Sequence, residues 1–270
     1  MSVLSVTPRR PGSRPLAHLR AMVLLGGSVR AGAFGSAIGR LVFQLPIDSS
    51  STILDSWSAA AADLAPVAEQ VIRLRVMIDK AAPQPLPITS AKAVEIERDP
   101  FDFRGTGGVL RDLASQYAPE DFLLVANAAQ ILCQPLSDTV SDLAAMGGDV
   151  SIVSHLDGTP SGLMLVRCGA LGSIPKEGFV DMKEQALPAI AKDHRVTVLH
   201  RQHPTALPVR TLSDYIQALR HHHQRRAGIV SPSDAFSESC ESTFAIIKAG
   251  ASVDPTAKLH DSIVLRGGRL

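Results

Sequence analysis

The chain is poor in cysteine and in aromatic residues. Its three cysteines, Cys133, Cys168 and Cys240, lie far apart and form no C-x-x-C pair, which argues against a disulfide framework and against a thiolate zinc site. Aromatic residues make up only 4% of its 270 residues. No run of about 18 apolar residues occurs, which excludes a membrane-spanning helix. We therefore expect a cytoplasmic protein that does not associate with membranes.

The chain also lacks a strong net charge. Its 27 basic and 26 acidic side chains leave a net charge of +1, so the surface as a whole does not attract nucleic acid or anionic lipid. We expect no nucleic-acid partner, and any polyanion site must be a local cluster of basic residues. With 45% hydrophobic residues, the length suits one large domain, alone or with an appendage.

Acidic residues are missing from the start of the chain. Asp48 is the first, whereas arginines precede it at positions 9, 10, 14, 20, 30 and 40. Residues 1–20 combine arginines and serines with three prolines and lack the apolar core of a secretory signal, which predicts a disordered leader. A transit peptide is the alternative, but the prolines oppose the amphipathic helix that such peptides form.

Apolar runs alternate with helical patterns over residues 21–226. The predicted strands are 21–25, 71–78, 93–97, 121–126, 149–154, 161–167 and 196–199, and the predicted helices are 52–65, 105–117, 137–146, 180–191 and 211–226. This alternation predicts an α/β domain with a mostly parallel sheet that helices cover on both faces. Ligands bind such sheets at the carboxyl ends of the strands. We therefore look for a site in the loops 26–36, 98–108, 127–134 and 154–161.

The last part of the chain has a different composition. Residues 227–242 are rich in Ser, Gly and Pro, which predicts a linker. In residues 243–270, small and branched residues recur at the six-residue spacing of a left-handed β-helix. Two coils are not stable alone, so we expect this tail to pack on the main domain, to pack on a partner chain, or to be a remnant. An oligomer is one possible consequence.

Two glycine-rich loops predict a phosphate site. The segment Gly26-Gly27-Ser28-Val29-Arg30 follows the first strand, and Gly105-Thr106-Gly107-Gly108 opens a helix. Backbone amides of glycines, a helix N-terminus and an arginine fork all favour phosphate oxygens. Each signal alone is weak, because a glycine pair after a strand is more often a simple turn. The first loop has neither G-x-G-x-x-G nor a P-loop pattern, which disfavours those folds.

The order of these motifs resembles that of the sugar nucleotidyltransferases, the nucleoside-diphosphate-sugar pyrophosphorylases. Leu24 to Arg30 is similar to the L-A-G-G-x-G-T-R loop of that family, and it retains Gly26, Gly27 and Arg30. Further similarities cover the P-K-P-L-x-P, G-T-A-G-A-L, N-G-D, A-G-I-Y, D-L-E-x-D and G-T-P-E-D-Y segments, which correspond to residues 39–46, 105–110, 122–127, 162–171, 181–188 and 211–215. The resemblance runs from about residue 21 to the C-terminus.

The resemblance implies a Rossmann-like nucleotidyltransferase domain with a mixed, mostly parallel sheet and a left-handed β-helix tail. It implies a nucleoside triphosphate and a sugar phosphate as ligands, with Mg²⁺ as cofactor if the protein is active. Arg30 and Arg40, the latter in place of a lysine, are the implied catalytic residues. The implied nucleotide-binding residues are Gly26, Gly27, Ser28, Gly105, Thr106, Gly107 and Asn127.

The chain departs from the family where metal chemistry is expected. Transfer of a nucleotidyl group to a sugar phosphate crowds negative charge and needs magnesium held by carboxylates. The aspartate of N-G-D is Ala129 here, and the second ligand aligns with Pro208, followed by Val209 and Arg210. The segment that carries an E-K-P motif in the family is shortened to 154–160. We therefore predict no protein-held metal site.

Several loop acids and histidines are candidate replacements for the missing metal ligands. Asp79, Asp99, Asp102 and Asp157 are loop acids that could face the cleft, but each is more simply a turn former, a cap or a solvated acid. Asp102 is the best candidate because arginines lie close in sequence, although these also suggest an ordinary ion pair. The histidines at 200, 203 and 221–223 lack the partners or the spacing of a metal site.

Two functions follow. One is a divergent but active sugar nucleotidyltransferase with relocated metal ligands. The other, which the missing carboxylates favour, is a degenerate relative that binds nucleotide or phosphate and regulates or supports an active homologue through its tail. A scaffold without a ligand is a third possibility, and it predicts that the loops at Arg30 and Gly105 do not converge.

Overall fold

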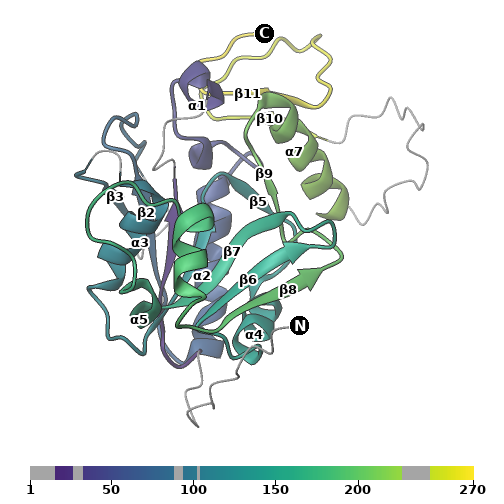
Figure 1. The fold of residues 1–270 in the computed structure, drawn as a ribbon. Helices are drawn as coiled ribbons and strands as arrows, with labels where there is room; N and C mark the ends of the chain where they lie inside the picture. The colour runs from purple at the N-terminus through teal and green to yellow at the C-terminus, as the bar shows by residue number, and fades with distance from the viewer. Residues whose placement is uncertain (1–15, 27–32, 88–93, 102–103, 227–243) are drawn as a thin grey trace.

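The computed structural model describes residues 16–26, 33–87, 94–101, 104–226 and 244–270 (Figure 1). A seven-stranded sheet in the order β3-β2-β1-β4-β7-β6-β8 forms its centre. The strands are β1 (Leu19–Leu25), β2 (Arg73–Ile78), β3 (Val94–Arg98), β4 (Phe122–Asn127), β6 (Val150–His155), β7 (Pro160–Arg167) and β8 (Val196–Arg201). The predicted leader and linker lie mostly outside the described residues, although β1 already begins at Leu19.

The sheet is mixed, and β7 supplies the antiparallel part. Neighbours β3-β2, β2-β1, β1-β4 and β6-β8 pair in parallel, whereas β7 runs antiparallel to both β4 and β6. A tight turn returns β7 along β6, with the His155 amide donating to the Thr159 carbonyl at 2.9 Å and Gly158 at φ 82°. The predicted α/β fold with a mixed, mostly parallel sheet is therefore confirmed.

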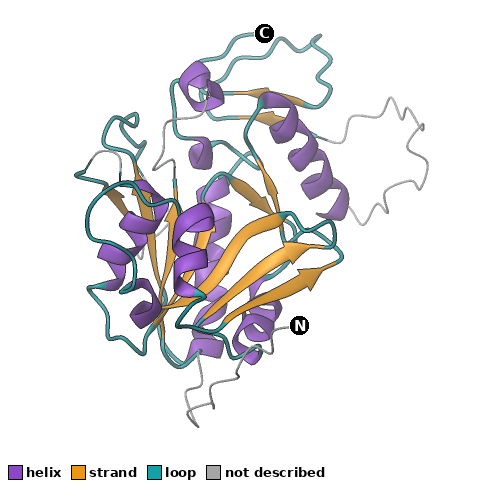
Figure 2. Ribbon diagram, in the orientation of Figure 1, coloured by secondary structure: helices purple, strands orange, loops and turns teal. Residues whose placement is uncertain are grey.

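Helices cover both faces of the sheet (Figure 2). Along β1, Met22 and Leu24 belong to one buried cluster, whereas Ala21 and Val23 belong to the other, as the alternation of a strand requires. The first cluster includes residues of α2 (Ile53–Ala68) and α4 (Leu136–Ala145). The second includes residues of α3 (Gly105–Ala114), α5 (Cys168–Leu171), the π-helix η2 (Met182–Ala186) and α6 (Leu187–Ile190).

Helix α2 begins as the sequence predicts. The Thr52 hydroxyl accepts from the Asp55 amide at 3.2 Å, and the Asp55 carboxylate accepts from the Thr52 amide at 2.8 Å. This reciprocal capping box satisfies two amides that the first helical turn leaves free. Further along α2, the buried Trp57 donates its indole N–H to the Gln130 carbonyl at 3.1 Å. The helix is thereby attached to the segment that follows β4.

A small second layer lies beside the main sheet. Strands β5 (Gln130–Leu132) and β9 (Ala206–Pro208) pair antiparallel, and α7 (Leu212–Arg226) follows β9. The short helix α1 (Ala33–Ile38) and the 3-10 turn η1 (Val42–Gln44) precede α2. The pairing of β5 with β9 matters for the site because it brings the residues after β4 against those before α7.

The tail corrects one expectation. Strands β10 (Ala245–Ile247) and β11 (Ser262–Val264) pair in parallel, and Ser252 bridges to Arg269. A left-handed β-helix is not evident among the described residues. The β10–β11 pair and the Ser252–Arg269 bridge join only two layers of chain, whereas the coils of a solenoid need neighbours on both sides. The tail packs on the main domain, one of the three expectations for it: Arg220 Nε lies 2.6 Å from Asp261 Oδ2, and Lys248 Nζ donates to the Ser49 carbonyl at 2.8 Å.

Within the described ranges, no helix is both long enough and apolar enough to cross a membrane.

Candidate functional site

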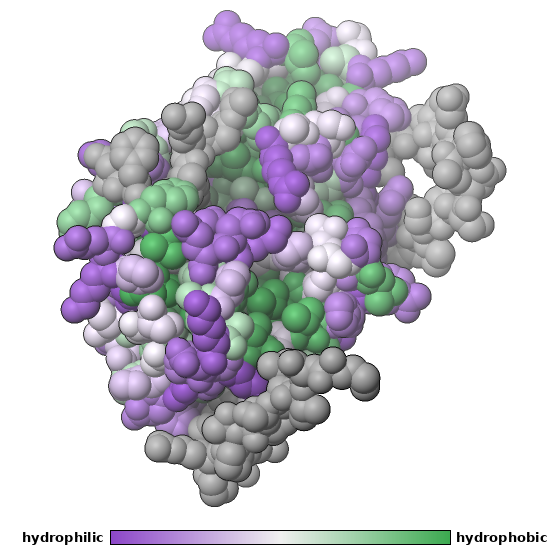
Figure 3. Space-filling model, in the orientation of Figure 1, coloured by the Kyte–Doolittle hydropathy of each residue, from purple (hydrophilic) through white to green (hydrophobic). Residues whose placement is uncertain are grey.

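A cavity of about 580 Å³ lies at the carboxyl ends of β1 and β4. Of the predicted site residues, Gly26, Arg40, Thr106 and Asn127 all line it, although they come from four separate segments. On the face seen in Figure 3, apolar residues occupy hollows between hydrophilic ones. The cavity lies where a parallel α/β sheet is expected to bind its ligand.

Gly26 allows the cavity wall to close around Phe43. Its amide donates to the Met77 carbonyl at 2.8 Å. A Cβ at this position would lie 2.9 Å from Phe43 Cε1 and 3.2 Å from Ile78 Cγ2. Gly26 therefore serves close packing, and its amide is already used within the sheet. Gly27, Ser28 and Arg30 lie outside the described residues, so their roles stay predictions.

Gly105 and Gly107 do not line the cavity. Gly105 has φ 68°, and a Cβ on it would lie 2.3 Å from the Val180 carbonyl oxygen. The Gly107 amide donates to that same oxygen at 2.9 Å, and the Val180 amide donates to the Arg104 carbonyl at 3.0 Å. These glycines let the segment before η2 approach the first turn of α3, so in this structure the first turn of α3 contacts protein.

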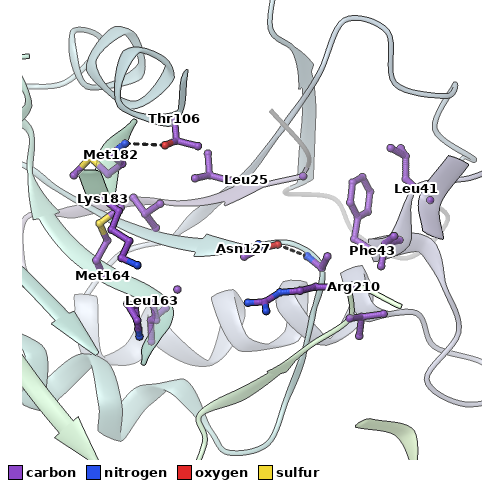
Figure 4. A pocket seen from close by; sticks show the side chains of 18 of the residues that line it. Leu25, Leu41, Phe43, Thr106, Asn127, Leu163, Met164, Met182, Lys183 and Arg210 are labelled. Carbon is purple, nitrogen blue, oxygen red and sulfur yellow. Dashed lines mark hydrogen bonds between the residues drawn. The ribbon is translucent and has the colours of Figure 1, made fainter. Parts of the chain in front are cut away.

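Thr106 lies between them and faces the cavity. Its Oγ1 accepts from the Met182 amide at 3.0 Å (Figure 4). Asp181, which also lines the cavity, caps η2: its Oδ1 accepts from the amides of Lys183 and Glu184 at 2.8 and 2.9 Å. The start of α3 thus holds residues 181–183 against the cavity.

The turn after β4 presents the side-chain amide of Asn127 to the cavity. The Asn127 Oδ1 accepts from the Ala129 amide at 2.9 Å, and the Ala128 amide donates to the Leu25 carbonyl at 3.0 Å. With its oxygen engaged in this turn, Asn127 keeps its NH₂ group for a ligand oxygen. Ala129 itself lines the cavity and contributes only a methyl group.

The charged residues that line the cavity are mostly cationic. Arg40, Lys183 and Arg210 line it, and Asp181 is the one acid among the described lining residues. Lys183 Nζ lies 3.8 Å from Glu184 Oε1, and both side chains are exposed, so this is a weak pair. Figure 4 shows Arg210 extending into the cavity near Asn127. The arrangement favours an anion.

The sequence drew attention to Arg210 and Asp181 only through their neighbours and did not single out Lys183. Arg210 follows Pro208, the position aligned with a metal ligand, and Asp181 begins a segment that resembles a family helix. The available signal was therefore the family alignment. The approach of both residues to the cavity depends on contacts that join distant parts of the chain.

The donor set does not fit a protein-held magnesium ion. Within the described part of the chain, no group of three or more His, Cys, Asp or Glu side chains could hold a metal. Magnesium prefers carboxylate oxygens, but the two positions at which the resemblance implies metal ligands hold Ala129 and Pro208, and Asp181 is used as a cap.

The other candidate acids have structural partners. Asp99 forms an ion pair with Arg104 at 2.7 Å. Asp79 Oδ1 accepts from the Ala81 amide at 2.7 Å, and Asp157 Oδ1 accepts from the Thr159 amide at 2.8 Å. The Thr159 amide lowers the pKa of Asp157, which keeps this turn carboxylate ionised. Asp102 lies outside the described residues.

No protein-family model and no curated protein sequence matches the chain. Solved structures do match. HddC from Yersinia pseudotuberculosis aligns over 76% of this chain and 100% of its own, with 14% identity and a TM-score of 0.55. The same protein complexed with GMP-PN aligns over 76% and 100%, with 12% identity and a TM-score of 0.52.

A proposed glucose-1-phosphate thymidylyltransferase from Bacillus anthracis, in complex with a sucrose, aligns over 74% of this chain and 94% of its own. The identity is 9% and the TM-score is 0.53. At identities of 14%, 12% and 9%, these similarities show a shared fold and no more. Together with the motif order and the position of the cavity, it shows that this chain has the nucleotidyltransferase fold of the nucleoside-diphosphate-sugar pyrophosphorylase type.

Proposed function

We propose that this protein binds a nucleotide or a related phosphate ligand in the cavity at β1 and β4 and does not catalyse nucleotidyl transfer to a sugar phosphate. One observation carries the proposal: Arg210 lines the cavity, and its chain neighbour Val209 is hydrogen-bonded to Ala129, the position at which the resemblance places a metal-binding carboxylate. A guanidinium binds phosphate oxygens directly and in a bidentate geometry.

The electrostatics support binding over catalysis. The cations at positions 40, 183 and 210 attract a polyphosphate. Nucleotidyl transfer, in contrast, builds up negative charge in its transition state. In phosphoryl-transfer enzymes, magnesium neutralises that charge. The complex of HddC with GMP-PN supports a nucleotide as the ligand for this fold.

An active, divergent nucleotidyltransferase is the second candidate. Asp181 places one carboxylate at the cavity, and only its Oδ1 accepts from the amides of Lys183 and Glu184. In this alternative, a magnesium ion would arrive with the triphosphate and use the Asp181 carboxylate. The two candidates differ in whether magnesium changes affinity and whether product forms.

The regulatory part of the proposal concerns the tail. Strands β10 and β11 form a two-stranded sheet whose outer edges have no strand partner among the described residues. We propose that this sheet contacts a second copy of the chain or an active homologue. Analytical ultracentrifugation of the full chain and of a chain ending at Arg226 tests the homo-oligomer: the proposal expects a dimer only with the tail.

Calorimetry and a product assay test the cavity. ATP, GTP, CTP and dTTP are titrated into the protein with magnesium or with EDTA, and pyrophosphate is measured after adding glucose 1-phosphate. We expect one or more nucleotides to bind equally well with EDTA, and no pyrophosphate to form. A ligand at 100 times its Kd should stabilise the fold by about 2.7 kcal/mol. Magnesium-dependent pyrophosphate release establishes the second candidate instead.

A further inference from the structure

One end of the cavity has an apolar floor that spans three strands. Val125 of β4 pairs with Met164 of β7, and Met164 pairs with Ile152 of β6. Residues paired in this way project from the same face of a sheet. The three side chains therefore form one continuous row, and all three line the cavity.

Two further apolar residues complete this end. Met182 of η2 and Leu187 of α6 line the cavity and belong to the same hydrophobic cluster as the row. Val125 is 1% exposed, whereas Ile152, Met164 and Leu187 are only partly buried and offer apolar surface. In Figure 4, Met164, Met182 and Lys183 lie at one end, Leu41 and Phe43 lie at the other, and Asn127 and Arg210 lie between them.

The polar groups near this floor are few and largely engaged. Thr106 Oγ1 accepts from Met182, and Asp181 Oδ1 caps η2. The turn between β6 and β7 is closed by its own hydrogen bonds, from the Gly158 amide to the His155 carbonyl at 3.0 Å and back from His155 to Thr159. Among the described residues of this end, the Lys183 ammonium and the Thr106 hydroxyl keep donors, and Asp181 Oδ2 keeps acceptor capacity.

A sugar ring carries more hydroxyls than this end offers polar partners. The hydroxyls that face the apolar row would leave water, and a buried hydroxyl without a partner costs free energy. An aromatic or aliphatic group on the same floor gains from the removal of apolar surface from water. Lys183 and Arg210 can meanwhile bind a phosphate that is attached to that group.

We infer that this end of the cavity binds a phosphate monoester whose organic part is apolar, an aryl or alkyl phosphate, with the organic part on the Val125–Met164–Ile152 row and the phosphate at Arg210 and Lys183. The inference rests on the proposed function, because it uses the same cations as the anion site. It gives the cavity an apolar phosphate, in place of a sugar phosphate, as a ligand that competes with the nucleotide for these cations.

Calorimetry with 1-naphthyl phosphate, glucose 1-phosphate and inorganic phosphate tests the inference. We expect 1-naphthyl phosphate to bind at least about tenfold more tightly than either of the others. Ile152→Gln should remove most of this advantage and leave the affinity for inorganic phosphate unchanged. The control is Val198→Gln: Val198 pairs with Ile152 on the neighbouring strand, is 42% exposed and does not line the cavity.

The outcomes separate this inference from the proposed function. If glucose 1-phosphate binds as tightly as 1-naphthyl phosphate, or if the two variants lose affinity equally, the apolar subsite is wrong. Arg210-dependent binding of a nucleoside triphosphate in the same samples would leave the proposed function standing. If no triphosphate binds and Arg210→Ala has no effect on any ligand, both fail. Leu187→Gln, on a different element, serves if Ile152→Gln does not fold.

Discussion

The Val209 amide donates a hydrogen bond to the Ala129 carbonyl oxygen at 2.8 Å. This bond continues the pairing of β5 with β9 and joins the turn after β4 to the segment before α7. It also fixes the position of the next residue, Arg210, whose amide is held by Asp214 Oδ2 at 3.0 Å. The backbone of a cationic residue is thus fixed beside the turn at which the resemblance implies a metal ligand.

Arg210→Ala should weaken binding of a nucleoside triphosphate by about 10- to 150-fold, because a hydrogen bond to a charged group contributes roughly 1.5–3 kcal/mol. The melting temperature should hardly change, since the Arg210 side chain forms no ion pair with an acid among the described residues. Calorimetry and thermal unfolding check the two effects. Arg195→Ala, which removes an exposed arginine outside the cavity, is the matched control. A large fall in melting temperature would make Arg210 a structural residue.

Ala129→Asp combined with Arg210→Ala should make triphosphate binding depend on magnesium. The double variant offers a carboxylate, the ligand that magnesium prefers, and removes the nearby cation. Ala129→Asp alone should not, because the new carboxylate would pair with Arg210. Titration of GTP with and without magnesium measures this effect. An equal response of the single and double variants would show that Arg210 does not control metal binding here.

Gly105→Ala should destabilise the protein by about 3 kcal/mol, from the left-handed backbone conformation and from the clash with Val180. Gly39→Ala separates the two causes: Gly39 has φ 63°, but a Cβ there meets nothing within 4 Å. We expect about 1 kcal/mol for that control. Urea unfolding followed by the fluorescence of Trp57, the single tryptophan, measures both. Similar losses in the two variants would refute the proposed role of the contact with Val180.

Asp48 should make stability depend on pH in the acid range. Burial raises its pKa, but hydrogen bonds from Ser51 and Ser50 outweigh this and hold the pKa at about 2, below the ordinary 3.8. A carboxyl whose pKa is lowered by folding contributes stability above its unfolded pKa and loses it as pH falls through the folded pKa.

We therefore expect Asp48→Asn to lower the free energy of unfolding by about 1–2 kcal/mol at neutral pH, a range reduced to allow for solvent screening. The difference from the wild type should shrink as pH falls from about 4 towards 2. Urea unfolding at several pH values measures the difference. A constant difference across this range would mean that the Asp48 charge is not responsible.

Local signals made much of the fold predictable. The start of α2 follows from short-range chemistry, with Thr52 and Asp55 in a capping box. Its end was not predicted correctly: the helix runs to Ala68 and not to 65, and Glu69 takes the left-handed conformation after it. The hydrophobic runs of β1, β2 and β4 are those of buried parallel strands. The direction of β7 was not predictable in the same way, because it depends on a turn that returns the chain to β6 and on pairing with the distant β4.

The site was predictable in part for the same reason. Gly26 and Thr106 lie in glycine-rich loops beside a predicted strand and a predicted helix, whereas Arg40 and Asn127 were implied only by the family resemblance. Lys183 and Arg210 reach the cavity only through long-range contacts, those of Val180 with Arg104 and of Val209 with Ala129. The packing role of Gly105 was hidden because a glycine at a helix start suits phosphate binding and close packing equally well.

The backbone bonds between α3 and Val180 carry a wider consequence. The Val180 amide donates to Arg104 and the Val180 carbonyl accepts from Gly107, so both of its backbone groups are bonded to the start of α3. Lys183 lies three residues further along the chain. A change at Gly105 would therefore displace a cation without altering any side chain in contact with the ligand. A natural substitution at this buried glycine would in this way change the relative affinity of the cavity for different anions, although every residue that lines it stays the same.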